Sequence, residues 1–122
     1  MKIGIVMSDG YPEPEHVTEY VKSAPFPEGT EIVGRGGDTV EKSAELRGLR
    51  FHGFPMTPDY RTAFGDVAGM KQGELVVGFS ERVVVFWDAG DREVAHIIRL
   101  ALMEGKLQKV TTPWGTLRLE RK

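Results

Sequence analysis

The most apolar run of the chain is Arg82-Val83-Val84-Val85-Phe86-Trp87, and it ends abruptly in the turn residues Asp88-Ala89-Gly90-Asp91. A run of large apolar residues without polar alternation is typical of a strand covered on both faces, as in the middle of a parallel sheet. A helical pattern follows this turn directly. In such folds ligands bind beyond the carboxyl ends of the strands, so the turn after Trp87 is the first candidate for a site.

The composition predicts one domain over residues 1–122. The 16 Lys and Arg against 18 Asp and Glu give a formal net charge of −2, so no overall field favours nucleic acid or an anionic membrane. Cys is absent, which excludes disulfides and Cys-based zinc sites. No apolar run has membrane-spanning length, and the amino terminus lacks the length of a signal peptide. We therefore expect a soluble cytoplasmic protein that binds neither nucleic acid nor membranes.

The chain also lacks Asn and contains only two Gln, Gln72 and Gln108. Heat-adapted proteins avoid these thermolabile residue types, so the composition favours a thermophilic host. Chance in a short chain is the alternative.

The amino-terminal third predicts two strand-to-helix units. A buried strand over residues 2–7 ends in a turn over residues 8–12, and apolar residues at helical spacing follow up to Ala24. A short strand over residues 30–33 then runs into Gly34-Arg35-Gly36-Gly37-Asp38. Asp38 and Glu41 match a capping box that starts a helix reaching about Arg47.

The next part of the sequence predicts a third strand over residues 49–54 and a less regular segment over residues 60–79. Gly65, Gly69 and Gly73 would share one face of a continuous helix there, which favours close packing against the sheet or a partner subunit. The alternative is an interrupted helix with loop segments, because each glycine weakens a helix.

The carboxyl-terminal part predicts the central strand over residues 82–87, a helix over residues 91–104, a strand over residues 107–111 and an edge strand or hairpin. Strand and helix alternate throughout, which indicates a small Rossmann-like α/β sandwich with about five parallel strands. With the strand order 3-2-1-4-5, the loops at Ser8 to Tyr11 and Trp87 to Asp91 would face each other across one crevice.

Taken together, these motifs resemble the SLOG superfamily of Smf- and LONELY GUY-related nucleotide-binding domains, especially its small stand-alone members of the YspA-like kind. The resemblance extends from about Met1 to Thr111 and rests on Ser8-Asp9-Gly10, Gly34-Arg35-Gly36-Gly37-Asp38, Ala68-Gly69 and Phe86-Trp87-Asp88-Ala89-Gly90. It implies a Rossmann-like fold and a nucleotide-like ligand.

The sequence departs from this family at its phosphate anchor. The helix after the central strand starts with Asp91-Arg92-Glu93-Val94, where the family has hydroxyl and glycine residues, and two carboxylates repel a phosphate. The Pro-Gly-Gly-x-Gly-Thr-x-x-Glu signature of the LONELY GUY phosphoribohydrolases is absent. We therefore expect a binding module without efficient catalysis. Two alternatives are an N-glycosidic hydrolase of nucleoside monophosphates and a homo-oligomeric assembly protein with a vestigial site.

The predicted ligand-binding residues lie in the three loops at the carboxyl ends of the strands, and we expect no metal and no resident cofactor. They are Ser8, Asp9, Gly10, Tyr11, Gly34, Arg35, Gly36, Gly37, Trp87, Asp88 and Gly90. Asp38 is either a ligand group or a helix cap, Trp87 stacks a base or packs in the core, and Asp88 binds ribose or shapes a turn. The glycine-faced helix further predicts a homo-oligomer.

Overall fold

Six strands form one sheet in the order β3-β2-β1-β4-β5-β6 in the computed structural model, which describes residues 1–119. All neighbouring strands are parallel except β5 and β6, which form an antiparallel hairpin. The bounds are β1 (Lys2–Met7), β2 (Glu31–Gly34), β3 (Arg50–Gly53), β4 (Arg82–Phe86), β5 (Leu107–Thr112) and β6 (Gly115–Arg118). The predicted strand order 3-2-1-4-5 and the carboxyl-terminal hairpin are confirmed.

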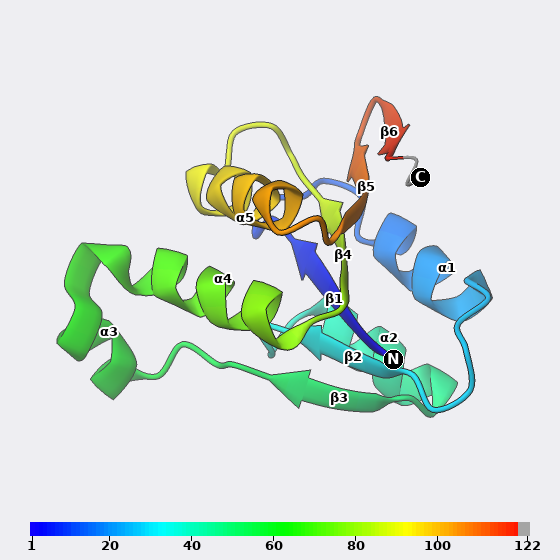
Figure 1. Ribbon diagram of the computed structural model, residues 1–122, viewed down its shortest axis with the longest axis horizontal. Helices are drawn as coiled ribbons and strands as arrows, with labels where there is room; N and C mark the ends of the chain where they lie inside the picture. The colour runs from blue at the N-terminus through cyan, green and yellow to red at the C-terminus, as the bar shows by residue number, and fades with distance from the viewer. Residues whose placement is uncertain (120–122) are drawn as a thin grey trace.

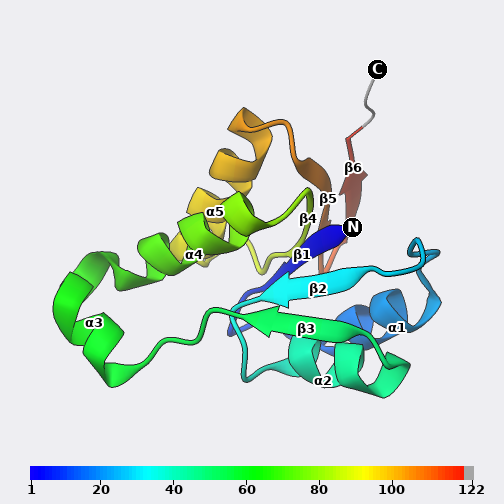
Figure 2. The ribbon, with the colours of Figure 1, turned by 60° about the horizontal axis from the view of Figure 1, so that its bottom comes forward.

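Helices cover both faces of this sheet, as Figures 1 and 2 show. On one face lie α1 (Glu15–Ser23) and α2 (Thr39–Arg47), and on the other lie α4 (Ala68–Phe79) and α5 (Arg92–Met103). A short helix, α3 (Pro58–Phe64), precedes α4 and projects beyond the sheet. Within residues 1–119 no helix combines the length and apolar character needed to cross a membrane.

The central strand β4 has buried side chains on both faces, which explains its unbroken apolar run. Val84 and Phe86 belong to the core under α1 and α2. Val83 and Val85 belong to the core under α4 and α5. The strand therefore separates two hydrophobic layers, as its sequence predicts.

Three predicted helix boundaries are confirmed by their capping contacts. Asp38 Oδ1 accepts hydrogen bonds from the backbone amides of Val40 and Glu41 at the start of α2. Gly48 ends that helix with a φ of 78°. Asp91 Oδ1 accepts from the Val94 amide at the start of α5. These local signals need no tertiary context, so they are readable from the sequence.

The glycine-rich segment over residues 60–79 is an interrupted helix, which was one of the two alternatives, and its close packing is against another helix rather than the sheet. The helix is interrupted at Gly65, whose φ is 56°, and a single 3₁₀ turn (Gly65–Val67) leads into α4. Within α4, Gly69 and Gly73 lie directly against Glu93 and Ile97 of α5. The close neighbour of this glycine face is therefore α5 of the same chain. This face is covered by α5, so it gives no support to the predicted homo-oligomer. The homo-oligomer itself stays a prediction.

Candidate functional site

The loops that follow β1 and β4 meet at the carboxyl edge of the sheet. The Ser8 side chain is fully buried, and its Oγ accepts a hydrogen bond of 3.2 Å from the Asp88 amide. A Cβ on Gly10 would lie 3.1 Å from Asp88 Oδ2. The two loops thus touch each other, so that Ser8, Gly10 and Asp88 close the space between them.

The concave part of this edge lies beside these loops, toward β2, β3 and the start of α5. It is a cleft of about 400 Å³. Its lining comes from six elements or loops and consists of Asp9, Arg35, Gly36, Gly37, Asp38, Pro55, Met56, Arg61, Gln72 and Glu93. Of the eleven predicted ligand-binding residues, Asp9, Arg35, Gly36 and Gly37 line this cleft.

Arg35 is the central side chain of the cleft. It is buried, and its Nη2 donates a hydrogen bond of 2.7 Å to the carbonyl oxygen of Met7. Asp9 Oδ1 lies 3.8 Å from Nη2, and Glu93 Oε2 lies 3.7 Å from Nη1. Both separations exceed an ordinary hydrogen bond. Within residues 1–119, the Met7 carbonyl is the one hydrogen-bond partner of this guanidinium, so further N–H donors remain for a ligand.

Glu93 reaches the cleft because α4 presents a glycine at this point. The Glu93 carboxylate lies where a Cβ of Gly69 would be. Any larger residue at position 69 would displace this carboxylate from its place beside Arg35. Gln72 lies one helical turn later, and its Nε2 donates a hydrogen bond of 2.6 Å to the Phe54 carbonyl oxygen. This bond joins α4 to the loop after β3.

The glycine loop after β2 is used mainly for helix capping. The Gly37 amide donates to Glu41 Oε1 at 2.8 Å, while Asp38 Oδ1 accepts from the Val40 and Glu41 amides. Glu41 therefore binds the amide one residue before the one that a capping box uses. Burial raises the pKa of Asp38 despite the two amide donors and the nearby Arg35 guanidinium, which lower it. Gly34 is a buried residue of β2 packed against the Phe51 ring. The capping role of Asp38 is therefore the one that its contacts satisfy.

The two predicted aromatic residues lie outside the cleft lining. Tyr11 is 6% exposed, packs edge-on against Phe86, and its hydroxyl is 2.8 Å from His16 Nδ1. Trp87 packs against the core under α5, and its Nε1 donates to the Asp91 carbonyl. Both side chains are occupied by protein contacts, which corresponds to the core-packing alternative for Trp87.

Asp88 shapes the turn between β4 and α5. Its Oδ1 accepts from the amides of Gly90 and Asp91 at 2.8 and 2.9 Å. Between them, Ala89 has a φ of 69°, a left-handed conformation that an L-residue with a Cβ rarely adopts. Such strain collects at functional sites, but the resulting turn itself is exposed and lies outside the cleft lining.

No group of three or more His, Asp or Glu side chains that could hold a metal ion occurs within the part of the chain that the structure describes. His96 lies on α5 with its Nε2 3.9 Å from Glu74 Oε1. Among the ionisable groups that line the cleft, the Asp9 and Glu93 carboxylates each lie within 4.0 Å of the buried Arg35 guanidinium.

Sequence reasoning missed half of the cleft lining, namely Pro55, Met56, Arg61, Gln72 and Glu93. Pro55 and Met56 directly follow the third strand, so the same carboxyl-edge rule would have included them. Gln72 and Glu93 lie within helices, where only knowledge of the helix packing reveals the direction of a side chain.

The strand order and the alternation of strands and helices make this a Rossmann-like α/β fold. No protein-family model matches the chain, and no curated protein matches it significantly.

Proposed function

We propose that the cleft around Arg35 binds a nucleotide or a nucleotide-derived small molecule, as the SLOG resemblance implies. Its position supports this, because Rossmann-like folds bind nucleotides at the carboxyl edge of the sheet beside the switch point between β1 and β4. The proposal rests mainly on the buried Arg35 guanidinium, which is held by a hydrogen bond to the Met7 carbonyl. Its other N–H donors remain for a ligand in the cleft.

The chemistry of the lining matches separate parts of such a ligand. The carboxylates of Asp9 and Glu93 accept hydrogen bonds from ribose hydroxyls, and Arg35 lies between them. Pro55 and Met56 offer an apolar surface for the face of a base, and Arg61 adds a cation to the lining. The volume of about 400 Å³ lies within the usual range of small-molecule sites.

The charge balance of the cleft selects among nucleotides. The lining holds two cations, Arg35 and Arg61, and three acids, Asp9, Asp38 and Glu93. A triphosphate would bring several negative charges close to these carboxylates, which costs binding free energy. We therefore expect nucleosides and nucleoside monophosphates to bind more tightly than triphosphates.

A thermal-shift series with adenosine, guanosine, their 5′-mono- and triphosphates and the corresponding 2′-deoxy compounds tests this proposal. A ligand at about a hundred times its Kd stabilises a protein by about 2.7 kcal/mol. With an unfolding entropy of about 2.1 cal/mol/K per residue, 122 residues convert this into a Tm increase of about 10 °C. Ribonucleosides should exceed their deoxy counterparts, because the carboxylates bind the hydroxyls.

Two variants assign the binding to the cleft. Glu93→Gln keeps the shape of the side chain and removes the carboxylate charge, so it should abolish the preference for ribose over deoxyribose. Arg50→Gln is the matched control, because Arg50 is 81% exposed at the opposite end of β3 and lies outside the cleft lining. Absence of any shift with the whole series would contradict the proposal, as would equal losses in both variants.

One observation also favours the enzymatic alternative, an N-glycosidic hydrolase. The sequence alone offers no clear acid at the site, whereas Glu93 lies in the cleft beside Arg35. A carboxyl group near a bound ribose can assist departure of the base. Release of free base from a nucleoside monophosphate, lost in Glu93→Gln and kept in Arg50→Gln, would support this reaction. Binding without release supports the binding module.

A further inference from the structure

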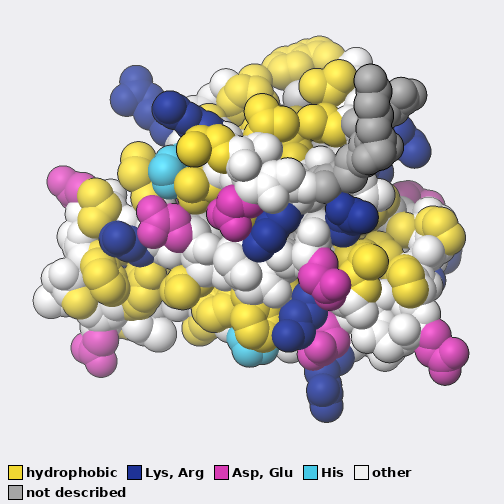
Figure 3. Space-filling model, in the orientation of Figure 1, with side chains coloured by type: hydrophobic (Ala, Val, Ile, Leu, Met, Phe, Trp, Pro, Cys, Tyr) yellow, Lys and Arg dark blue, Asp and Glu magenta, His cyan; other side chains and the backbone are white. Residues whose placement is uncertain are grey.

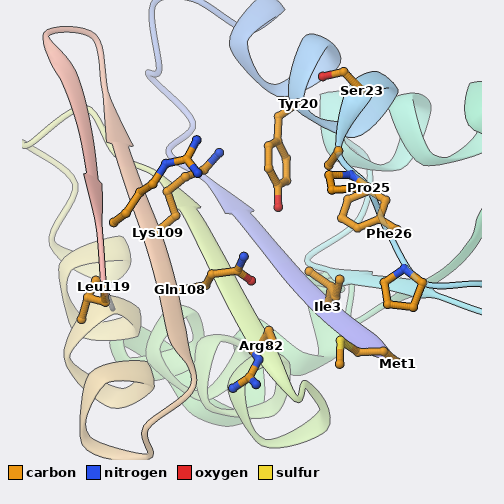
Figure 4. A pocket seen from close by; sticks show the side chains of 13 residues that line it. Met1, Ile3, Tyr20, Ser23, Pro25, Phe26, Arg82, Gln108, Lys109 and Leu119 are labelled. Carbon is orange, nitrogen blue, oxygen red and sulfur yellow. The ribbon is translucent and has the colours of Figure 1, made fainter. Parts of the chain in front are cut away.

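A second concavity lies on the opposite face of the sheet, between α1 and the β5–β6 hairpin. After β5 the chain turns into β6 rather than into another helix, and a groove of about 610 Å³ remains beside α1 (Figure 4). Its lining consists of Met1, Ile3, Tyr20, Ser23, Ala24, Pro25, Phe26, Pro27, Arg82, Gln108, Lys109, Arg118 and Leu119. Met1, Ile3 and Arg82 place it toward the amino ends of β1 and β4, away from the cleft around Arg35.

Within residues 1–119, the charged side chains that line this groove all carry one sign. Three cations line it, Arg82, Lys109 and Arg118, and the lining residues within 1–119 include no Asp or Glu. None of the three side chains forms an ion pair with another residue of that range. On the face of the molecule that Figure 3 shows, acidic and basic side chains are mixed. Unpaired like charges in one concavity repel each other unless a counter-charge binds between them.

A β-bulge directs two polar side chains of β5 into the groove. Val83 pairs with Leu107 and Val84 pairs with Lys109, so Gln108 is the additional residue of β5. Leu107 and Val110 on either side of this pair are both in the core under α5. The bulge therefore allows Gln108 and Lys109 to line the same side, where regular alternation would separate them.

Lys109 is held in place by an aromatic ring, and no carboxylate within residues 1–119 forms an ion pair with it. Its Nζ lies 3.8 Å from the centre of the Tyr20 ring, a cation–π contact that fixes the ammonium within the groove. Burial and, to a smaller extent, the Arg118 charge lower the pKa of Lys109. Burial raises the pKa of Tyr20, so its hydroxyl stays protonated and can donate.

We propose that this groove is a second ligand site, which binds a small molecule carrying two or more negative charges. The ligand is an oligophosphate or a polycarboxylate, since both chemistries match three cations together with the Gln108 and Tyr20 donors. The volume suits a small molecule, and the formal net charge of −2 gives no long-range attraction for a nucleic acid. This inference does not depend on the function proposed for the cleft.

Isothermal titration of the full chain with pyrophosphate and with citrate at low ionic strength tests the site. We expect a submillimolar Kd for at least one of them, and the tighter ligand identifies the phosphate or the carboxylate chemistry. Lys109→Met keeps the aliphatic stem against Tyr20 and should weaken binding at least tenfold. Arg118 lies on the exposed strand β6, so replacing it should not impair folding. Arg118→Gln should weaken binding by a similar factor.

Arg99→Gln is the matched control, because Arg99 is an exposed arginine of α5 that is not part of the groove. Its Kd should stay within twofold of the parent value. The site is refuted if neither anion binds with a Kd below 10 mM, or if Arg99→Gln weakens binding as much as Lys109→Met and Arg118→Gln. Glu93 lines the cleft and not the groove. If pyrophosphate stabilises the parent and Glu93→Gln equally, the anion binds in the groove and not in the cleft.

Discussion

Replacing Gly73 by Ala tests the packing of α4 against α5 most directly. A Cβ at position 73 would lie 2.5 Å from Ile97 Cγ1 and 2.9 Å from Ile97 Cδ1, where ordinary contacts begin at 3.4 Å. Ile97 is fully buried, so it has little room to move away. Overfilling a packed core in this way costs about 1–3 kcal/mol. The better helix propensity of Ala returns about 1 kcal/mol, so Gly73→Ala should lower the free energy of unfolding by up to about 2 kcal/mol.

Gly78→Ala is the matched control for this experiment. Gly78 lies in the same helix with an ordinary φ, and a Cβ at this position would have no atom within 4 Å. The same substitution should therefore increase the free energy of unfolding by about 0.5–1 kcal/mol through helix propensity alone. The two variants should differ by about 1–3 kcal/mol, or roughly 4–12 °C in Tm for a chain of this length.

Urea unfolding followed by circular dichroism measures both variants, with equal slopes required for the comparison. A double-mutant cycle with Ile97→Ala locates the effect, because removing the Ile97 side chain also removes the clash. The double variant should be at least about 1 kcal/mol more stable than the sum of the single changes predicts. Equal stabilities of Gly73→Ala and Gly78→Ala, or additive effects in the cycle, would show that the helices do not meet at Gly73.

Three further predictions concern the site and its loops. Gly69→Ala should displace the Glu93 carboxylate, so we expect nucleoside binding to weaken in the thermal-shift series while Tm changes by less than for Gly73→Ala. Ala89→Gly should raise stability by up to about 1 kcal/mol in urea unfolding, because glycine adopts the φ of 69° without strain; an unchanged or lower stability would contradict the strained turn. Asp38→Ala should lose the helix cap and about 1 kcal/mol relative to Asp38→Asn, which still caps α2. The folded-state pKa of Asp38 is raised by burial, so its stabilising contribution is complete at low pH and is lost as the pH rises through that pKa. Asp38→Asn should therefore gain stability relative to the parent between about pH 3 and pH 7, and a difference independent of pH would exclude this titration.

The parts of the fold that the sequence predicts are those set by local rules. Three signals each act within a few residues: the unbroken apolar run of β4, the helix cap at Asp38 and the terminating glycine at position 48. Their order along the chain then restricts the sheet to very few topologies. The separate helix α3 was not predicted, because its Thr57 cap and Pro58 lie in a segment whose later glycines dominate the pattern.

Side-chain direction in the loops was the less predictable part. Tyr11 follows the first strand as a ligand-binding residue would, but its hydroxyl meets His16 and its ring fills a gap beside Phe86. Both partners belong to elements that the sequence predicts correctly. The rotation of the loop that brings them together depends on packing, which no periodicity records.

The cations of the groove illustrate the same limit at longer range. Arg82, Lys109 and Arg118 lie on three different strands and form no cluster in the sequence. The net charge of −2 describes the whole chain and does not reveal a local excess of positive charge. The balanced composition therefore argues only against a strong electrostatic field around the molecule as a whole. The bulge that directs Gln108 toward these cations changes the strand alternation by a single residue, which the sequence alone does not reveal.

The acidic start of α5 shows how one helix end can serve two purposes. From the sequence, Asp91 and Glu93 together argue against an anion at this point. In the structure Asp91 is engaged by the Val94 amide, which it caps, and only Glu93 reaches the cleft. Glu93 can do so because Gly69 leaves its position free. The glycine face of α4 and the carboxylate beside Arg35 are therefore one feature, and the proposed ligand is expected to donate hydroxyl hydrogen bonds to Glu93 rather than to place a phosphate there.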